Sequence, residues 1–240
     1  MISYDNIDIR SIADVRIEDI RVSSISLSQT ERPRTISAGS VFVRNRAAKR
    51  TVTVTFALLS DDINARQAAL MAINAWAKTD KEYRIELIGH PDHYLTGVCT
   101  SKPDPSTRQW WESKLRLVFT CYDNPYWTGK VEKSVACGTA FTVLGDAPPL
   151  MRITKTRNSA ASNQSYARDG KTIKFSTVPI GDMTIDLNSE TAYVETTGGG
   201  ITVTTDLMQY YVATSRWFSP KIGAQTITGS GTIKYRERFE

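Results

Sequence analysis

Residues 115–122 show a clear alternation of apolar and other side chains. Every second residue from Leu115 to Cys121 is apolar, which is the period-two pattern of a strand with one buried face. Pro125 follows and cannot donate a hydrogen bond to a sheet, and the residue before a proline avoids helical geometry. A strand over 110–122 is therefore predicted to end near Asp123. Two aromatic residues and a turn-like segment, 128–130, come next, so a boundary between two units is predicted here.

The first unit is predicted to be a β domain over residues 1–130. Segments rich in β-branched residues or with alternating apolar positions predict extended structure over 10–28, 51–58, 83–89 and 93–100. Between the first two of these, proline, serine and glycine predict a long loop or arm over 30–40.

One helix is predicted in the first unit, over residues 62–78. Its start is indicated by Ser60, Asp61 and Asp62, which supply an N-cap and acidic side chains for the first turn, and Lys78 lies in the last turn. An apolar stripe along it is expected to pack on a sheet and consists of Ile63, Leu70, Ile73 and Trp76.

The second unit, residues 131–240, has a different pattern. Short β-prone segments are separated by glycines, and no helix is indicated. Many short strands at regular spacing predict an antiparallel sandwich or jelly roll. The predicted strands lie near 140–144, 150–156, 171–176, 180–187, 190–196, 200–206, 209–214, 222–228 and 231–239, with a flexible hairpin tip at Gly198–Gly200.

Composition restricts the function classes. No apolar run is long enough for a transmembrane helix, and the N-terminus has no basic leader with an apolar core, so neither membrane insertion nor secretion is expected. The three cysteines, Cys99, Cys121 and Cys137, form no even framework and are expected to be buried thiols in a reducing compartment. A net charge of +5 permits an acidic partner without indicating nucleic acid.

The basic side chains are concentrated in one span in which Glu31 is the only nearby acid. A solvated loop between two strands would explain this cluster, and the alternative is a charged surface that faces a channel or a neighbouring subunit. Stacking aromatics are not interleaved with it, which weakens single-strand nucleic-acid binding. The candidate inter-subunit or channel residues are Arg32, Arg34, Arg44, Arg46 and Arg50.

No catalytic, cofactor or metal site is predicted. His90 and His93 lack a further ligand at suitable spacing and are typical of a turn that leads into a strand. The carboxylate pairs Asp182 with Asp186 and Glu18 with Asp19 are best explained as solvated surface groups. Glycines 198–200 lack the lysine of a phosphate-binding loop. An enzyme is therefore not expected.

Several motifs follow one another along the first unit, each weak alone. They are the β-branched opening that ends in a loop with Gly39, the basic turn Arg46–Arg50 into Thr51–Leu58, the helix that ends near Trp76, Pro91–Tyr94 before a strand, and the closing Phe119–Tyr126. In the order of these motifs the chain resembles the distal tail proteins of siphophages, the tail-tip hubs of phages and prophages of Gram-positive bacteria. The family more often has aspartate where Asn124 precedes the proline.

The second unit resembles the galectin-like sandwich of the same family. The matching segments are Gly145–Pro149 at the entry, Ile185–Glu190, Trp217–Gly223 and the closing Tyr235–Phe239. The resemblance therefore implies a mainly β fold: an N-terminal, split-barrel-like β domain with one α-helix and an extended arm, followed by a galectin-like antiparallel β-sandwich.

The family also implies a function as a virion structural protein. The first domain would form a homo-hexameric ring around a channel, at the distal end of the tail, after synthesis in the host cytoplasm. The implied partners are the major tail tube protein, the tape-measure protein, the tail-associated lysin and receptor-binding or baseplate proteins. DNA would be only passing cargo, and no cofactor is implied.

A second hypothesis is a carbohydrate-binding module that attaches the virion to cell-wall glycans, because galectin-like folds often bind sugars. A sugar site usually stacks its ligand on an exposed aromatic ring. The candidate platforms are Trp217, Tyr210 and Tyr211; the other interpretation is that these rings pack in the core or in an interface. A glycoside hydrolase, which would need two carboxylates across a groove, is the third hypothesis.

Overall fold

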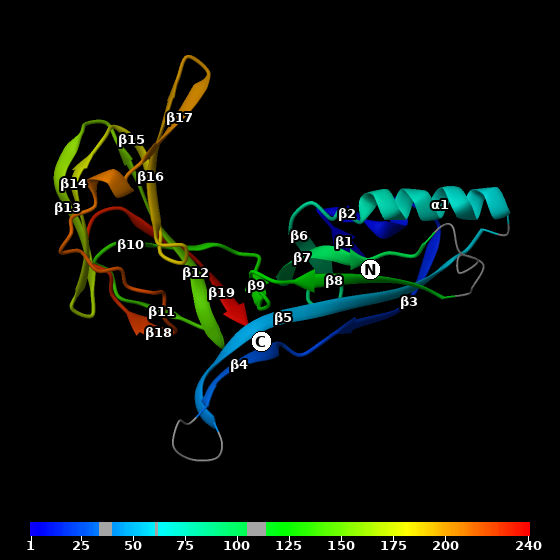
Figure 1. Cartoon of the computed structure of the whole chain (residues 1–240). Coiled ribbons are helices and arrows are strands. Elements are labelled where there is room, and N and C mark those ends of the chain that lie inside the picture. The colour runs from blue at the N-terminus through cyan, green and yellow to red at the C-terminus, as the bar shows by residue number, and fades with distance from the viewer. Residues whose placement is uncertain (34–39, 61, 105–113) are drawn as a thin grey trace. The chain divides into compact units, whose positions relative to one another are not determined.

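The computed structural model describes residues 1–33, 40–60, 62–104 and 114–240, and over 27–33 and 40–47 it describes the backbone alone. These residues form two compact units, Met1–Trp127 with Glu240, and Thr128–Phe239. Both units consist mainly of antiparallel strands, and within the described part of the chain the first unit carries the single α-helix (Figure 1). The mainly β fold class predicted from the sequence is confirmed.

The first unit is a continuous antiparallel ladder. Its neighbours pair in the order β3-β5-β8-β7-β6-β1-β2, and β4 pairs with the remaining part of β5. The strands are β1 (Ile2–Tyr4), β2 (Ile7–Asp8), β3 (Val15–Val22), β4 (Ser26–Pro33), β5 (Ser40–Leu58), β6 (Tyr83–Leu87), β7 (His93–Ser101) and β8 (Leu115–Cys121), with a 3-10 turn at Ile9–Ser11.

Helix α1 (Ile63–Trp76) covers the apolar face of this ladder. Asp62 is the N-cap, and its side chain accepts a hydrogen bond from the backbone N–H of Ala65 at 2.8 Å. The ring of Trp76 meets the ring of Tyr4 edge-on at 5.7 Å, and Tyr4 packs against Phe119 at 4.8 Å. Aromatic pairs at such distances favour this tilted packing, so the core of the unit joins the helix to the first and last strands.

The predicted apolar stripe of the helix is correct only in its C-terminal half. Leu70, Ile73 and Trp76 are buried, but Ile63 is 38% exposed. The buried residues of α1 all lie in its last two turns. This is the part of the helix that packs on the core. The first turns present their side chains to solvent.

Strand β8 ends at Cys121, close to the position that the proline predicted. The carboxylate of Glu82 accepts the backbone N–H groups of Tyr122 and Asp123 at 2.5 and 3.2 Å, so these donors are satisfied after the ladder stops. The predicted turn over 128–130 is partly wrong, because Trp127–Gly129 form the short strand β9. Trp127 is buried, and its ring stacks on His90 at 4.1 Å.

The second unit is an antiparallel sandwich. One layer has the order β17-β16-β15-β12-β19-β10, and two shorter pairs, β13–β14 and β11–β18, form the opposite layer. The strands are β10 (Lys133–Ala136), β11 (Phe141–Val143), β12 (Ala147–Arg157), β13 (Ala161–Arg168), β14 (Lys171–Val178), β15 (Gly181–Asp186), β16 (Thr191–Gly198), β17 (Ile201–Asp206), β18 (Gly223–Gln225) and β19 (Thr232–Phe239).

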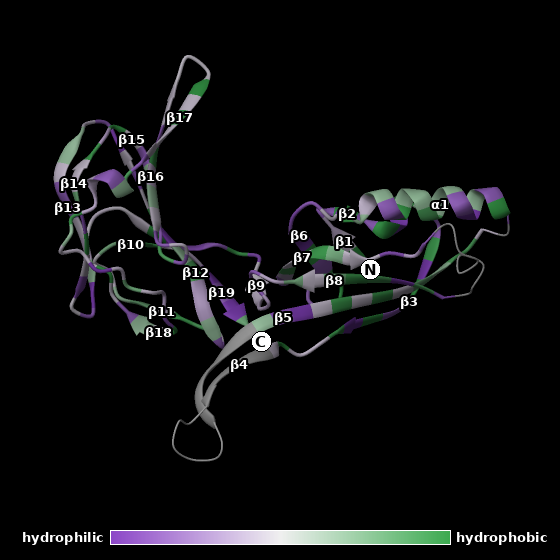
Figure 2. Ribbon diagram, viewed as in Figure 1, coloured by the Kyte–Doolittle hydropathy of each residue, from purple (hydrophilic) through white to green (hydrophobic). Residues whose placement is uncertain are grey.

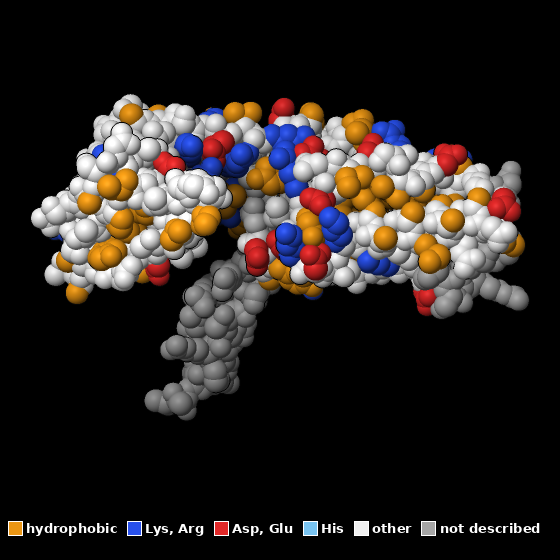
Figure 3. Space-filling model, turned by 90° about the horizontal axis from the view of Figure 1, so that it is seen from above, with side chains coloured by type: hydrophobic (Ala, Val, Ile, Leu, Met, Phe, Trp, Pro, Cys, Tyr) orange, Lys and Arg blue, Asp and Glu red, His pale blue; other side chains and the backbone are white. Residues whose placement is uncertain are grey.

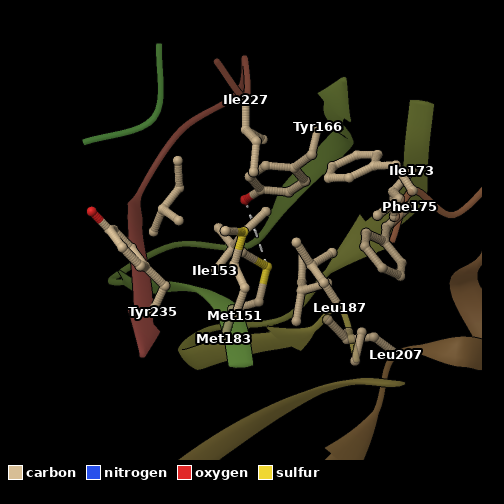
Figure 4. Close-up of a cluster of buried hydrophobic side chains, with 14 of the residues drawn as sticks. Met151, Ile153, Tyr166, Ile173, Phe175, Met183, Leu187, Leu207, Ile227 and Tyr235 are labelled. Atoms are coloured by element: carbon tan, nitrogen blue, oxygen red, sulfur yellow. Dashed lines mark hydrogen bonds between the residues drawn. The ribbon is translucent and has the colours of Figure 1, made fainter. Parts of the chain in front are cut away.

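Apolar side chains from both layers point toward one another in the sandwich core (Figure 4). Met183 from β15 faces Tyr166 from β13, whose hydroxyl lies 4.0 Å from the methionine sulfur and donates to the carbonyl of Ser230 at 3.0 Å. Ile173 and Phe175 of β14 are fully buried in the same cluster. The alternating pattern of these strands thus places one face in the core, as period-two reasoning predicts.

One predicted strand of the second unit is wrong, and two observed strands were not predicted. The predicted strand over 209–214 is replaced by a 3-10 turn, Met208–Tyr210, and a bridge between Tyr211 and Phe175. The chain turns here because the carboxylate of Asp206 accepts the backbone N–H of Met208 at 2.8 Å. Strands β10 and β13 were not predicted. For β13 (Ala161–Arg168) the reason is that it has few apolar residues.

Candidate assembly surfaces

Strand β5 leaves its sheet as one side of a two-stranded ribbon. Its C-terminal part, Arg50–Leu58, pairs with β3 and β8, whereas Ser40–Lys49 pair with β4 alone among the residues that the structure describes. We call this hairpin, residues 26–49, the charged ribbon. Two register shifts interrupt its ladder, and bulges of this kind increase the twist of a hairpin. Of the two alternatives predicted for 30–40, a loop is wrong for residues 30–33, which are strand, and an extended arm agrees with the ribbon; residues 34–39 lie outside the described part.

Three of the predicted contact residues lie in the charged ribbon. Arg44 pairs with Thr30, Arg46 with Ser28, and Arg32 with Val41. These backbone positions exclude the interpretation of a loop between strands for these three residues. Arg34 lies outside the described residues. A contact or channel role for these four arginines remains a prediction.

Arg50, the fifth candidate, is a buried side chain. It lies on the same face of β5 as Val52 and Val54, opposite Cys121 of β8, and is only 5% exposed. Within the described part of the chain its Nε and Nη1 atoms have no hydrogen-bond partner. Burial lowers the pKa of this guanidinium. In the single chain Arg50 is therefore a costly interior charge instead of a surface contact.

The outer face of β3, β5 and β8 is polar and charged. A bulge in β3 brings Glu18 and Asp19 onto this face together, and both line a shallow depression of ≈ 370 Å³. Glu18 pairs with Arg16 at 3.0 Å and Asp19 with Arg21 at 2.5 Å. The hydrogen bond from Arg16 lowers the pKa of Glu18. This carboxylate is thus held ionised, which does not suit a general acid.

The exposed side of α1 carries almost no charge. Arg66 is the only charged residue of the helix, and its guanidinium donates to the backbone carbonyl of Ser60. Met71 is 60% exposed. The other exposed residues that accompany it are uncharged and mostly small: Asn64, Ala65, Gln67, Ala68 and Ala75. Figure 3, which looks down on the side that carries the helix in Figure 1, shows apolar side chains spread over this face. Exposed apolar side chains that gather on one face are typical of a contact surface.

The predicted glycan platforms pack against the core of the sandwich. The rings of Tyr211 and Trp217 stack on each other at 5.9 Å and 11°, and Tyr211 meets buried Phe175 edge-on at 6.1 Å. Tyr210 is likewise packed against this core. Tyr211 and Trp217 turn one face toward each other, so the observed geometry assigns these rings a part in the packing of the sandwich.

A second ribbon, which we call the threonine ribbon, consists of residues 196–205 at the end of β16 and the start of β17. Its tip is the predicted glycine hairpin: Gly199 and Gly200 have φ values of 59° and 80°, as a type I′ turn requires. Ile201 and Val203 are 68% and 57% exposed. Figure 2 shows apolar residues near its tip. The sequence predicted the hairpin but not this exposed edge.

The remaining chemical candidates have structural roles. Asp186 accepts the backbone N–H groups of Asn188 and Ser189 at 2.8 and 3.1 Å, and Asp182 accepts the hydroxyl of Thr156 at 2.5 Å. Within the described ranges, no three histidine, cysteine or acidic side chains are grouped as metal ligands. No helix in this part of the chain is long and apolar enough to cross a membrane.

The cysteines show the burial expected from the sequence for Cys99 and Cys121, whereas Cys137 is only partly buried. Burial raises the pKa of the Cys121 thiol to about 12. A thiol of this kind stays protonated at neutral pH and is a poor nucleophile.

Comparison with known proteins gives a likeness in structure. No protein-family model matches the chain, and no curated protein matches its sequence. The crystal structure of Dit from phage SPP1, described as a paradigm of the hub adsorption apparatus in phages that infect Gram-positive bacteria, is 19% identical and covers 100% of this chain and 98% of its own, with a TM-score of 0.73.

Two structures of the phage P2 baseplate in its activated conformation also match. The one with calcium is 8% identical and covers 100% of this chain and 97% of its own, with a TM-score of 0.52. The one with strontium is 9% identical and covers 98% and 96%, also with a TM-score of 0.52. At such low identity the likeness establishes the fold. The chain has the fold of a phage distal tail protein, and the resemblance inferred from its sequence is confirmed at that level.

Proposed function

We propose that this protein is the structural hub of a phage tail tip. In this role the first unit forms a homo-hexameric ring that continues the tail tube. The ring joins the tube and the tape-measure protein to the tail-associated lysin and to receptor-binding or baseplate proteins. The observation that carries the proposal is the match in fold to SPP1 Dit over 100% of this chain and 98% of that one.

The surfaces of the first unit support a ring. A sixfold ring needs a heterologous contact, in which one patch of a subunit meets a different patch of the next. The charged ribbon and the uncharged face of α1 are two such different patches on one unit. The charged ribbon has no third strand within the described part of the chain, so its free edge can reach a neighbouring subunit and pair with it. We assign the ribbon arginines to this contact or to the channel wall, where they would meet passing DNA.

The hub role requires contacts and positions instead of a reaction. The carboxylates that the sequence singled out hold turns and ion pairs within one unit. No observation in the sandwich favours the carbohydrate-binding alternative, because Tyr211 and Trp217 stack on each other. Binding of the purified chain to host cell-wall glycans, lost in Trp217→Ala, would revive that alternative.

The oligomer tests the proposal directly. Native mass spectrometry and negative-stain images of the full chain should show six copies of the 26.8 kDa protein in a ring with an open centre. Isolated bilobed monomers at high protein concentration would overturn the ring. A tail-tip location is tested separately, by immunogold labelling of virions, and label on the capsid would contradict it.

A further inference from the structure

The open edge of the threonine ribbon has free backbone groups. Among the described residues, β17 is the last strand of its sheet and pairs only with β16. A type I′ turn places a hydrogen-bonded pair next to it, here Gly198 with Ile201, and such pairs alternate along the ladder. The N–H and C=O groups of Thr202 and Thr204 therefore point outward. The 3.1 Å contact between the hydroxyls of Thr197 and Thr202 agrees, since side chains approach in non-hydrogen-bonded pairs.

This edge lacks the usual protection against strand addition. Between Glu195 and Asp206 the chain has no charged residue and no proline. Natural edge strands are commonly protected by lysine, proline or a bulge, and the register of β16 with β17 shows no shift. An extended, uncharged segment can therefore add to β17.

We propose that this segment is β17 of a second copy of the chain, paired antiparallel about a two-fold axis at Val203. In this register Thr202 of one copy lies opposite Thr204 of the other. All outward backbone groups of both residues are then satisfied, in both copies at once. Thr202 and Thr204, the outward-facing residues of the threonine ribbon, lie symmetrically about Val203. The donors and acceptors of one copy therefore meet the acceptors and donors of the other.

The side chains fit the same register. Residues directly opposite each other in an antiparallel pair lie on the same face of the sheet. Val203 pairs with Thr196, and Thr205 pairs with buried Val194. Ile201 and Val203 therefore lie on the face that turns toward the core farther along the hairpin. In the paired ribbons, Val203 of one chain lies opposite Val203 of the other, and Ile201 of each chain is the diagonal neighbour of Val203 in the other chain. Cross-strand and diagonal apolar neighbours of this kind stabilise antiparallel pairs, and the exposed apolar residues become covered.

The contact is independent of the proposed ring. A two-fold contact is isologous and closes on itself, so it cannot generate a sixfold ring. It would join two free chains or chains of two rings. If no ring is observed, the β17 pairing can still be tested, and if the pairing is not observed, the ring can still be tested.

A cysteine at the axis tests the register. Val203→Cys should form a disulfide-linked dimer under mild oxidation, because the Cα atoms of a non-hydrogen-bonded antiparallel pair are about 4.5 Å apart, within disulfide range. The matched control is Ile201→Cys on the same face, whose two copies would be four residues out of register, about 13 Å apart. Both variants should carry Cys137→Ser, since Cys137 is only partly buried.

We expect at least tenfold more dimer on a non-reducing gel for Val203→Cys than for Ile201→Cys. Equal cross-linking of both would indicate random collision and would overturn the proposal. No cross-linking of either would overturn it as well.

A second variant tests the edge without changing its fold. Thr204→Lys places an amine opposite Glu195 within the hairpin, so the ribbon keeps its pairing while its edge gains a charge. Dimerisation, measured by sedimentation equilibrium of the full chain, should weaken at least tenfold. Unchanged dimerisation would contradict the proposal. A wild-type chain that stays unpaired but binds an extended foreign peptide at this edge would assign the site to another partner and would also overturn it.

Discussion

The two ribbons of this molecule differ in charge and in the strand from which each arises. The charged ribbon continues β5, a strand with partners on both sides within the first unit. The threonine ribbon ends the second unit's sheet at its edge strand β17. Both expose hairpin edges, which are templates for strand pairing. Several arginines lie in the first ribbon, whereas the second has no charge from residue 196 to 205.

This difference indicates two kinds of contact. A row of like charges opposes pairing of a ribbon with its own copy and favours a different, complementary surface. An uncharged ribbon with a symmetric pattern has no such restriction. We therefore expect the charged ribbon to make the heterologous contact of the ring and the threonine ribbon to make the two-fold contact.

Removal of the charged ribbon should have the largest effect. Replacing residues 27–48 by Asn-Gly joins Ser26 to Lys49, where the Ser26 hydroxyl already donates to the Lys49 carbonyl at 2.9 Å. Rings should disappear from negative-stain images, while the melting temperature stays within a few degrees because the core of the unit is unchanged.

The matched control shortens the other ribbon by replacing residues 195–204 with Asn-Gly, so that the new turn joins Val194 to Thr205, which form a hydrogen-bonded pair in this register. Rings should persist in this variant. Rings that persist in both variants would show that neither ribbon builds the ring.

Charge reversal in the charged ribbon should have the next largest effect. Arg44→Glu with Arg46→Glu should weaken ring assembly about tenfold or more, because contacts between charged groups at an interface commonly contribute over 1 kcal/mol. Mass photometry measures the fraction of rings over protein concentration.

The two ribbons should also respond differently to salt. Between about 0.1 and 1 M salt the Debye length falls from about 10 to about 3 Å, so assembly of the wild-type ring should weaken, whereas the Val203→Cys cross-link should be unchanged or stronger. Loss of the cross-link in high salt would remove the contrast between the ribbons.

Arg50 lies where the charged ribbon joins its sheet, and its replacement should stabilise the unit. Arg50→Met removes a buried guanidinium with unpartnered nitrogens and should raise the free energy of unfolding by about 1–2 kcal/mol. Exposed Arg116 on the opposite face of the sheet is the control, and Arg116→Met should change this value by less than about 0.5 kcal/mol. Urea titration measures both. Destabilisation of the Arg50 variant would show that this charge has a partner.

The smallest effect is expected at the tip of the threonine ribbon. Gly200 has a φ of 80°, which alanine adopts only with strain, so Gly200→Ala should destabilise the hairpin by about 1 kcal/mol. Neighbouring Gly198 has open space around it and no positive φ, so Gly198→Ala is the control. Hydrogen exchange of the Ile201 and Val203 amides should accelerate in the first variant only. Equal rates in both would contradict the type I′ turn.

Periodic patterns predicted much of the fold correctly. The alternation at Leu115–Cys121 and the following proline located β8 and its end, because burial on one face and the missing proline donor act within a few residues. Strand β13 and the strand pairing of the charged ribbon, which was predicted only as a loop or arm, were missed for the opposite reason. Their sequences are polar, and their extended form depends on partners, β14 for the first and the paired halves of the hairpin for the second.

The candidate sites were less predictable than the fold. The neighbours of Arg50 in the chain predict a surface arginine, yet it lies in the interior because it shares a face with Val52 and Val54. For Tyr211 and Trp217 the sequence leaves open a glycan platform or packing in the core, and only the fold shows that the two rings stack on each other. The lack of charge in α1 and in residues 196–205 was visible in the sequence and could have pointed to both surfaces.

The sequence by itself determined the β-rich plan, the helix and most of the strands, because these depend on local periodicity, capping and proline chemistry. Only the tertiary structure decided which side chains are covered and which strand edges stay open, because burial and pairing depend on segments far apart in the chain. Strand β17 illustrates the difference. Its alternating pattern predicts a strand, but only its place as the last strand of the sheet leaves Thr202 and Thr204 facing outward.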